Sequence, residues 1–299
     1  MTLEDQLRAH AVTDPETLKE APVSEILAPY TLKPIGAGLQ SRIFRLQDSP
    51  WVLKEGRWDL EFPVSSGISI PLYAQGVADL LAPSGFTFLP TDDHLARQVA
   101  EYRHLERFLG WNAEDPALAA EQRAVRAGLL ASLPEVEAFY GMELAASLGP
   151  VLDSPLRETG FLPREYLLLG RSISPQNQGK RTSFIFQEFI PGTPLHDVAL
   201  PTLGEGHRRQ LVLFLYLLLL LRARTGRVPD TRPRYPLAQA HDWFAKTDNI
   251  FMTENGFKLI DTGWLWSADD AMIRRGLIIP EMTITAAANT LSGLLKGLA

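Results

Sequence analysis

Residues 30–56 read YTLKPIGAGLQSRIFRLQDSPWVLKEG, and this segment contains three short runs rich in β-forming residues. The runs are separated first by Gly36-Ala37-Gly38 and then by Asp48-Ser49-Pro50. Two turn signals between three such runs predict a three-stranded antiparallel meander. The glycines of the first turn would let the backbone approach a ligand closely and present N–H groups to phosphate, although any hairpin turn can use glycine.

Lys54 lies in the third run, directly after the apolar residues Trp51, Val52 and Leu53. A cation on an apolar strand is costly unless it is paired or bound to phosphate. An exposed strand face would explain the same pattern, so this residue on its own leaves both interpretations open.

Further elements follow the meander along the chain. Residues 95–109 place apolar side chains at helical spacing, and the alanine-rich residues 114–148 indicate more helices. Residues 165–174 and 181–190 have the pattern of two strands with a polar turn between them, and a long apolar helix is expected around 205–225. Strands with one helix first, and mainly helices afterwards, favour an α+β protein with two lobes.

The predicted domain organisation has three parts. Residues 1–29 form an N-terminal extension with two short helices. Residues 30–190 form a β-rich N-lobe with a helical insertion at about 110–160, and residues 191–299 form a short, mainly helical C-lobe. Residues 57–95 are rich in Pro and Gly and give no clear element.

Composition narrows the class of protein. The chain has 299 residues, a formal net charge of −6 and no cysteine. The negative charge argues against a nucleic-acid or anionic-membrane partner, because both require basic surface. The absence of cysteine excludes disulfides, thiolate metal sites and cysteine nucleophiles, and it fits a reducing compartment. The N-terminal residues lack the basic-then-apolar order of a signal peptide, so we predict a cytoplasmic protein.

The run Leu211–Leu221 is the most apolar stretch of the chain. A bilayer span needs about 20 apolar residues, roughly twice the length of this run. We therefore expect a helix buried on nearly all sides, and no membrane span.

Residues 249–261 read NIFMTENGFKLID and predict a β-hairpin, because Asn255-Gly256 tolerates the positive φ angles of a type I′ turn. Asn249 precedes the first strand and Asp261 follows the second, so an amide oxygen and a carboxylate should converge. Hard oxygen ligands of this kind suit Mg²⁺, which fills its remaining positions with water and phosphate. Turn capping by Asn and ordinary loop chemistry at Asp-Thr-Gly would account for the same residues.

Taken together, these motifs resemble the protein-kinase-like superfamily, including its aminoglycoside- and lipopolysaccharide-kinase members. The order is a glycine-rich hairpin, Val52-Leu53-Lys54, a Glu-bearing helix, FQEFIPG (186–192), Lys246-x-x-Asn249-Ile-Phe, a hairpin, and Ile260-Asp261-Thr262-Gly263. The resemblance extends over roughly residues 30–265, and it implies a two-lobed, kinase-like fold that binds ATP and Mg²⁺ between its lobes.

The resemblance implies roles for the residues of the N-lobe. Lys54 would hold the α- and β-phosphates, with Gly36 and Gly38 in the loop above them. Glu101, one turn before a buried leucine, would be the helix partner of Lys54. Glu106 on the same helix is the alternative partner.

The resemblance also implies a hinge and a metal site. The hinge, whose backbone would meet the adenine, consists of Gln187, Glu188 and Phe189. The side chains of Asn249 and Asp261 would bind Mg²⁺.

The catalytic loop departs from the family pattern. The family places an Asp base five residues before the metal-binding Asn, and this chain has Phe244 at that position. Asp242 is the nearest candidate, two residues too early, whereas Lys246 matches the loop lysine. Either an insertion lets Asp242 reach the substrate or the loop has no base, and His241-Asp242 is alternatively a structural hydrogen-bonded pair. Phosphoryl transfer depends mainly on positioning and electrostatics, so loss of the base need not abolish it.

Three functions fit these observations. The first is an atypical kinase that moves the γ-phosphoryl of ATP to a hydroxyl of a small-molecule or atypical protein acceptor, because the short segment after Gly263 lacks the usual peptide-binding platform. The second is a pseudokinase that acts as a nucleotide- or partner-binding module. The third is an interaction protein that keeps the fold and binds no nucleotide. The helical insertion at about 110–160 would either cap the site or bind a protein partner.

Overall fold

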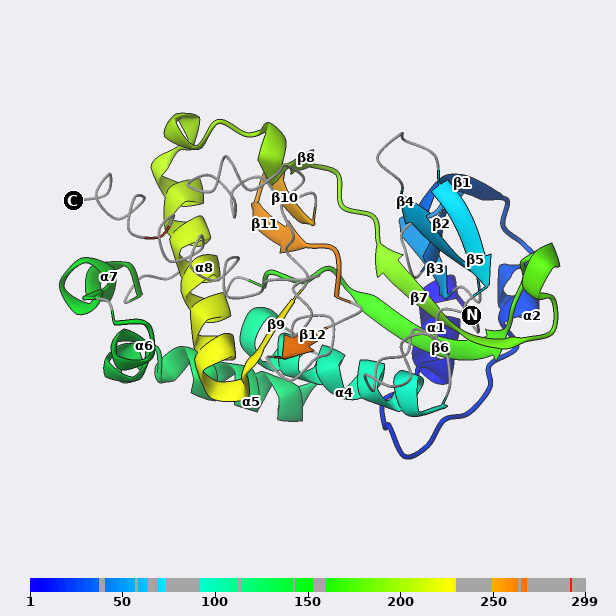
Figure 1. Ribbon diagram of the computed structural model, residues 1–299, viewed down its shortest axis with the longest axis horizontal. Coiled ribbons are helices and arrows are strands. Elements are labelled where there is room, and N and C mark those ends of the chain that lie inside the picture. The colour runs from blue at the N-terminus through cyan, green and yellow to red at the C-terminus, as the bar shows by residue number, and fades with distance from the viewer. Residues whose placement is uncertain are drawn as a thin grey trace. The chain divides into compact units, whose positions relative to one another are not determined.

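The predicted meander forms three strands of a five-stranded antiparallel sheet, ordered β1-β2-β3-β7-β6 (Figure 1). The computed structural model describes residues 1–37, 41–56, 59–63, 69–73, 92–111, 115–141, 143–152, 160–229, 249–262, 265–267 and 291. The strands of the sheet are Leu32–Ala37 (β1), Ser41–Leu46 (β2), Trp51–Gly56 (β3), Glu165–Arg171 (β6) and Arg181–Glu188 (β7). The meander and the two later strands are thus confirmed.

The chain divides into two compact units. Unit 1 consists of Met1–Ala100 and Arg164–Phe189, and unit 2 consists of Glu101–Pro163 and Ile190–Ala299. Residues 1–29 group with the sheet, whereas the helices predicted as an insertion group with unit 2. The described architecture is α+β.

Among its described residues, unit 1 contains α-helical segments and a second hairpin besides the sheet. These elements are Leu3–His10 (α1), Val23–Leu27 (α2), Asp59–Pro63 (β4), Ser69–Tyr73 (β5) and the first part of Asp92–Leu109 (α4). No strand was predicted for β4 and β5, because Pro63 ends the first and Pro71 lies in the middle of the second. Among the described residues these strands pair only with each other, so each strand has an outer edge. Proline is tolerated at such an edge, because no neighbouring strand there requires its missing N–H group.

The alternation of side chains along β3 separates the face that carries the hydrophobic cluster from the opposite face, on which Val52 is also buried. Trp51 and Leu53 belong to a buried cluster, whereas Val52 and Lys54 point to the other side of the sheet. The cluster combines residues of the sheet with residues of the two N-terminal helices: Leu7, Ala21, Val23, Ile26, Leu27, Leu46, Trp51, Leu53, Leu168, Phe184 and Phe186. Residues 1–29 therefore cover the core face of the sheet.

The N-terminal segment also covers the outer edge of β6. The N–H of Val12 donates to Leu167 O at 2.8 Å, and the N–H of Ala21 donates to Leu169 O at 2.7 Å. These bonds satisfy backbone acceptors that an edge strand would otherwise leave open. Gly170 fits this packing, because a Cβ there would lie 2.7 Å from Val23 Cγ2.

Unit 2 is built around the long helix α8, Glu205–Thr225. Its other described α-helices are Pro116–Ala127 (α5), Leu133–Tyr140 (α6), Ala145–Leu152 (α7) and the second part of α4. Every residue of α8 from Leu211 to Arg222 is buried, and the Tyr216 hydroxyl forms a 2.7 Å hydrogen bond with Ser132 Oγ. The expected buried helix is thus confirmed. Within the described part of the chain, we find no helix with the length and apolarity that a membrane crossing needs.

The predicted hairpin is present as β10 (Ile250–Thr253) and β11 (Gly256–Leu259), joined by Glu254 and Asn255. The predicted type I′ turn is wrong, because Asn255 does not have a positive φ; only Gly256 does, at 126°. A Cβ at Gly256 would also overlap Gln210 Oε1, so packing and backbone conformation both favour glycine at this position.

Three short strands complete the described part of unit 2. Thr193–Pro194 (β8) pairs with β10, while Arg227–Pro229 (β9) pairs with Leu265–Ser267 (β12). A Cβ at Gly192 would overlap Met252 O, so glycine allows the chain before β8 to approach β10 closely. Strands this short give no period-2 pattern, which explains why the sequence did not predict them.

Candidate functional site

Gly36 and Lys54 lie on the same face of the unit 1 sheet. Gly36 pairs with Ile43, Ile43 pairs with Lys54, and Lys54 pairs with Ile185, so these residues form one row across four strands. Directly paired residues of antiparallel strands share a face. Neighbouring strands are about 4.8 Å apart, which places the backbone of Gly36 roughly 10 Å from that of Lys54. The row therefore brings together two residues that were predicted to surround phosphate.

Neither backbone conformation nor packing explains the glycine at position 36. Its φ is not positive, and a Cβ there would lie 4.0 Å from Ile43 Cδ1, an ordinary contact. The register of β1 and β2 shifts between Pro34 and Gly36, which marks a bulge. Glycine in a strand accompanies bulges and also sites where a ligand approaches the backbone, so both interpretations remain.

Lys54 is half-buried on the face opposite the hydrophobic cluster, between two isoleucines that point the same way. Of these, Ile185 is 8% exposed. The Lys54 amine thus lies beside apolar side chains. In such surroundings its attraction to an anion is stronger than in water.

The next residue, Glu55, was not singled out from the sequence. It points to the opposite face, is 1% exposed, and its Oε1 accepts from Ser172 Oγ at 2.6 Å and from the Ile173 N–H at 3.0 Å. The available signal was that Glu55 continues the alternation of the apolar residues Trp51 and Leu53, which places its carboxylate on their face of the strand. These bonds fix the loop after β6 to the strand that carries Lys54.

The predicted hinge residues lie at the end of β7, beside β3: Gln187 and Glu188 are the last two residues of the strand, and Phe189 follows it. The N–H of Glu188 donates to Arg164 O at 2.9 Å, and the N–H of Phe189 donates to Pro50 O at 2.7 Å. An adenine base could therefore use only carbonyl oxygens at these two residues, and its acceptor atoms would need a donor elsewhere. Gln187 is buried and donates through its side chain to Glu165, while the exposed ring of Phe189 lies 4.0 Å from Arg45 Cζ.

Asn249 and Asp261 meet at the open end of the β10–β11 hairpin. The N–H of Ile260 donates to Asn249 O at 2.8 Å and closes this end of the ladder. The Asn249 Nδ2 atom lies 3.5 Å from Asp261 Oδ2, and both side chains are half-buried. The expected proximity of the two residues is confirmed, whereas their role as metal ligands stays a prediction.

The chemistry of this pair fits Mg²⁺. Among the described residues, this pair supplies two oxygen-bearing side chains, and no group of three or more His, Asp or Glu side chains that could hold a metal is found there. Mg²⁺ is often bound in this way, with water and phosphate oxygens filling the octahedron. The amide would rotate to present Oδ1, because its N–H group now faces the carboxylate.

Glu101 lies on α4 and is fully buried. Its Oε1 accepts from Nη1 of Arg227, at 3.1 Å, within unit 2. The predicted pairing of Glu101 with Lys54 stays a prediction. Glu106, the alternative, lies half-buried one turn later, and its carbonyl accepts from the Gly110 N–H at 2.9 Å.

Three predicted site residues fall outside the described part of the chain. They are Gly38, in the predicted turn after β1, and Asp242 and Lys246, in the predicted catalytic loop. Their roles stay as predicted from the sequence.

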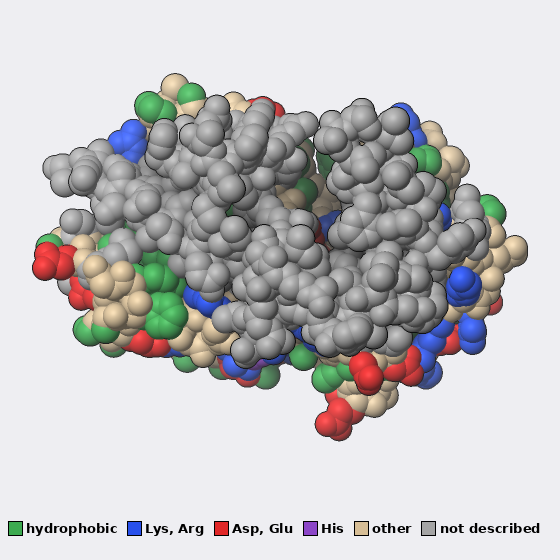
Figure 2. All heavy atoms as spheres, viewed as in Figure 1, with side chains coloured by type: hydrophobic (Ala, Val, Ile, Leu, Met, Phe, Trp, Pro, Cys, Tyr) green, Lys and Arg blue, Asp and Glu red, His purple; other side chains and the backbone are tan. Residues whose placement is uncertain are grey.

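Surface charge is mixed where the structure describes it. On the face shown in Figure 2, the described Lys and Arg side chains lie among Asp and Glu side chains. In unit 1, for example, Glu20 forms ion pairs with both Arg171 and Arg181. Basic side chains that are neutralised in this way contribute little to the binding of a polyanion.

We compared the chain with known proteins. No family model, no curated protein and no solved structure matches it.

Proposed function

We propose that this chain is an atypical phosphotransferase that uses ATP and Mg²⁺ and moves the γ-phosphoryl to a hydroxyl of a small-molecule or atypical protein acceptor. The observation that carries the proposal is the row on the unit 1 sheet, in which Gly36 and Lys54 share one face. In protein kinases the phosphate-binding lysine lies on the third strand, behind a glycine-rich loop. Lys54 lies on β3, and Gly36 lies near the end of β1, just before the predicted turn that contains Gly38.

Unit 2 supplies the second part of the proposed machinery. Asn249 and Asp261 would hold Mg²⁺, whose charge offsets that of the phosphates when it is bound. The 3.5 Å approach of their side chains supports this assignment. Lys54 would orient the α- and β-phosphates, and Asp242 would accept the proton of the acceptor hydroxyl.

An alternative function is that of a pseudokinase, a nucleotide- or partner-binding module without transfer activity. One observation favours it: Phe244 occupies the position of the family's base, and Asp242 is displaced by two residues. The two functions share the nucleotide and differ in turnover.

The test is thermal unfolding with ATP, in the presence and absence of Mg²⁺. A nucleotide that binds only the folded state raises the melting temperature by mass action. We expect a Mg²⁺-dependent rise in the wild type that is lost in Asp261→Ala and in Lys54→Met. Glu254→Ala removes an exposed carboxylate from the turn of the same hairpin and should keep the rise.

No rise at any ATP concentration, in a folded wild-type sample, would contradict both functions. A rise that Asp261→Ala and Glu254→Ala retain equally would contradict the metal assignment. Transfer of labelled phosphate from ATP, abolished by Asp242→Asn with binding intact, would then separate the transferase from the pseudokinase.

A further inference from the structure

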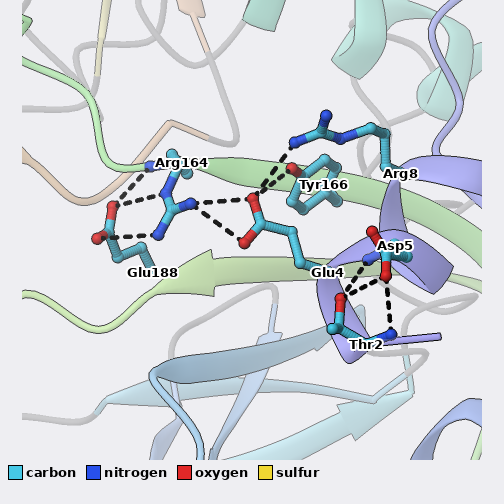
Figure 3. Close-up of polar contacts among 7 residues, drawn as sticks. All are labelled: Thr2, Glu4, Asp5, Arg8, Arg164, Tyr166 and Glu188. Atoms are coloured by element: carbon cyan, nitrogen blue, oxygen red, sulfur yellow. Dashed lines mark hydrogen bonds and ion pairs between the residues drawn. The ribbon is translucent and has the colours of Figure 1, made fainter. Parts of the chain in front are cut away.

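Arg164 connects the predicted hinge with the N-terminal helix α1 (Figure 3). Its Nε and Nη2 atoms lie 3.4 and 3.5 Å from the two carboxylate oxygens of Glu188. On its other side, Nη1 donates to both carboxylate oxygens of Glu4, at 2.9 and 3.2 Å. The planar guanidinium thus binds two carboxylates at once, a geometry that its fixed fork of donors allows.

Glu4 is itself held in place by several groups. The Tyr166 hydroxyl donates to Glu4 Oε1 at 3.2 Å, and Arg8 Nη2 lies 3.5 Å from the same oxygen. Thr2 and Asp5 cap the turn of α1 that carries Glu4, since the Asp5 N–H donates to Thr2 Oγ1 and the Thr2 N–H to Asp5 Oδ2. Burial, together with the charge and hydrogen bond of Glu4, raises the pKa of Tyr166 against the opposing effect of Arg8, so this hydroxyl stays a donor at neutral pH.

The backbone at Glu188 depends on the same arginine. The Glu188 N–H donates to Arg164 O at 2.9 Å, and the Arg164 N–H lies 3.4 Å from Glu188 Oε2. The guanidinium also lies over the ring of Trp51, 5.5 Å from its centroid. Its side chain is nevertheless 54% exposed, so packing alone does not fix its direction.

We propose that Arg164 is a positioning residue for the segment Glu188–Phe189, and that Glu4 on α1 keeps the arginine in that position. Removal of the Glu4 charge would let the half-exposed guanidinium turn toward solvent, and Glu188 would lose its orienting partner. The consequence for ligand binding rests on the proposed function: if this segment meets the adenine, α1 sets the affinity for nucleotide.

Amide hydrogen exchange of the protein without ligand tests the proposal. In Glu4→Gln we expect the N–H groups of Glu188 and Phe189 to exchange about two- to fivefold faster, the effect on a local opening equilibrium of losing the partly exposed ion pairs that Glu4 forms with Arg164 and Arg8. The control is Glu135→Gln on α6, which removes a comparable ion pair with Arg224, formed at 3.0 Å by a 43% exposed carboxylate. The control should leave both amides unchanged.

Unchanged exchange at both amides in Glu4→Gln would overturn the proposal. So would an equal acceleration at Leu53 and Phe186 in the centre of the sheet, because it would show a merely structural role. The affinity for ATP is then measured separately on the same variants. A wild type without ATP binding would contradict the proposed function, while the exchange data would still decide the role of Arg164.

Discussion

At the scale of single residues, His104 has an unusual electrostatic environment. It lies on α4 three residues after the buried Glu101, near the arginine that pairs with that carboxylate. Burial first, and then the positive charges of Arg227 and Arg107, lower its pKa below the ordinary value of 6.5. The imidazole is therefore neutral in the folded protein at neutral pH.

This shift predicts a pH dependence of stability. Below pH 6.5 the unfolded chain binds a proton at His104 that the folded chain binds only at lower pH. The free energy of unfolding should thus fall as the pH drops from 6.5 toward the lower pKa of the folded state. The stability that comes from keeping His104 neutral is fully present above pH 6.5. Urea unfolding at several pH values checks the slope. The slope should be shallower in His104→Gln, and an identical slope in variant and wild type would contradict the assignment.

Single residues also show what the sequence could predict about the site. The pairing of Asn249 with Asp261 followed from local geometry, because a hairpin returns its ends to one place. The partner of Glu101 did not follow, because Arg227 is distant in sequence and lies on a three-residue strand without a pattern. Local order thus reveals partners that a turn brings together, and it misses those that depend on the packing of distant segments.

At the scale of elements, the β10–β11 hairpin depends on Gly256. Gly256→Ala should lower the free energy of unfolding by about 1–3 kcal/mol, because a non-glycine residue is strained at its φ of 126°. Gly206→Ala, at an open position in the first turn of α8, is the matched control and should stabilise by about 0.5 kcal/mol. Urea unfolding measures both. Equal effects of the two substitutions would show that the turn does not impose this conformation.

Elements with a long apolar run were predicted correctly, and short elements without such a run were not. The buried helix α8 and the strands β6 and β7 have long apolar runs, so composition and length identified them. The pairs β4–β5 and β9–β12 are short or contain proline, so sequence patterns gave no signal for them. Each of these strands is held in place by its partner strand, and this pairing is not visible in the pattern of a single segment.

At the scale of the whole molecule, the order of strands could not be predicted. The meander indicated that β2 lies between β1 and β3, because turns connect them. In the structure β7, and not β6, pairs with β3. This choice depends on which face of each strand buries its apolar residues, and the sequence does not distinguish the two strands because both are apolar. The role of residues 1–29 was missed for a related reason, since short amphipathic helices do not indicate which surface they cover.

The N-terminal segment should be essential for the folding of unit 1. Residues 1–29 contribute Leu7, Val23, Ile26 and Leu27 to its core, and each is at most 5% exposed. Burial of such a side chain contributes about 1.5–3 kcal/mol, so the four together contribute roughly 6–12 kcal/mol. That amount is comparable to the whole stability of a domain, about 5–15 kcal/mol.

Deletion of residues 1–29 should therefore abolish cooperative unfolding of unit 1, as measured by circular dichroism and by exchange of the amides of β3 and β7. Leu7→Ala in the full chain gives a graded control and should cost about 2–5 kcal/mol. A deleted chain with wild-type protection in β3 and β7 would mean that the sheet buries its core face without α1 and α2. The hydrogen bonds from Val12 and Ala21 to β6 would then be dispensable as well, and the segment would be a true extension of a self-sufficient sheet.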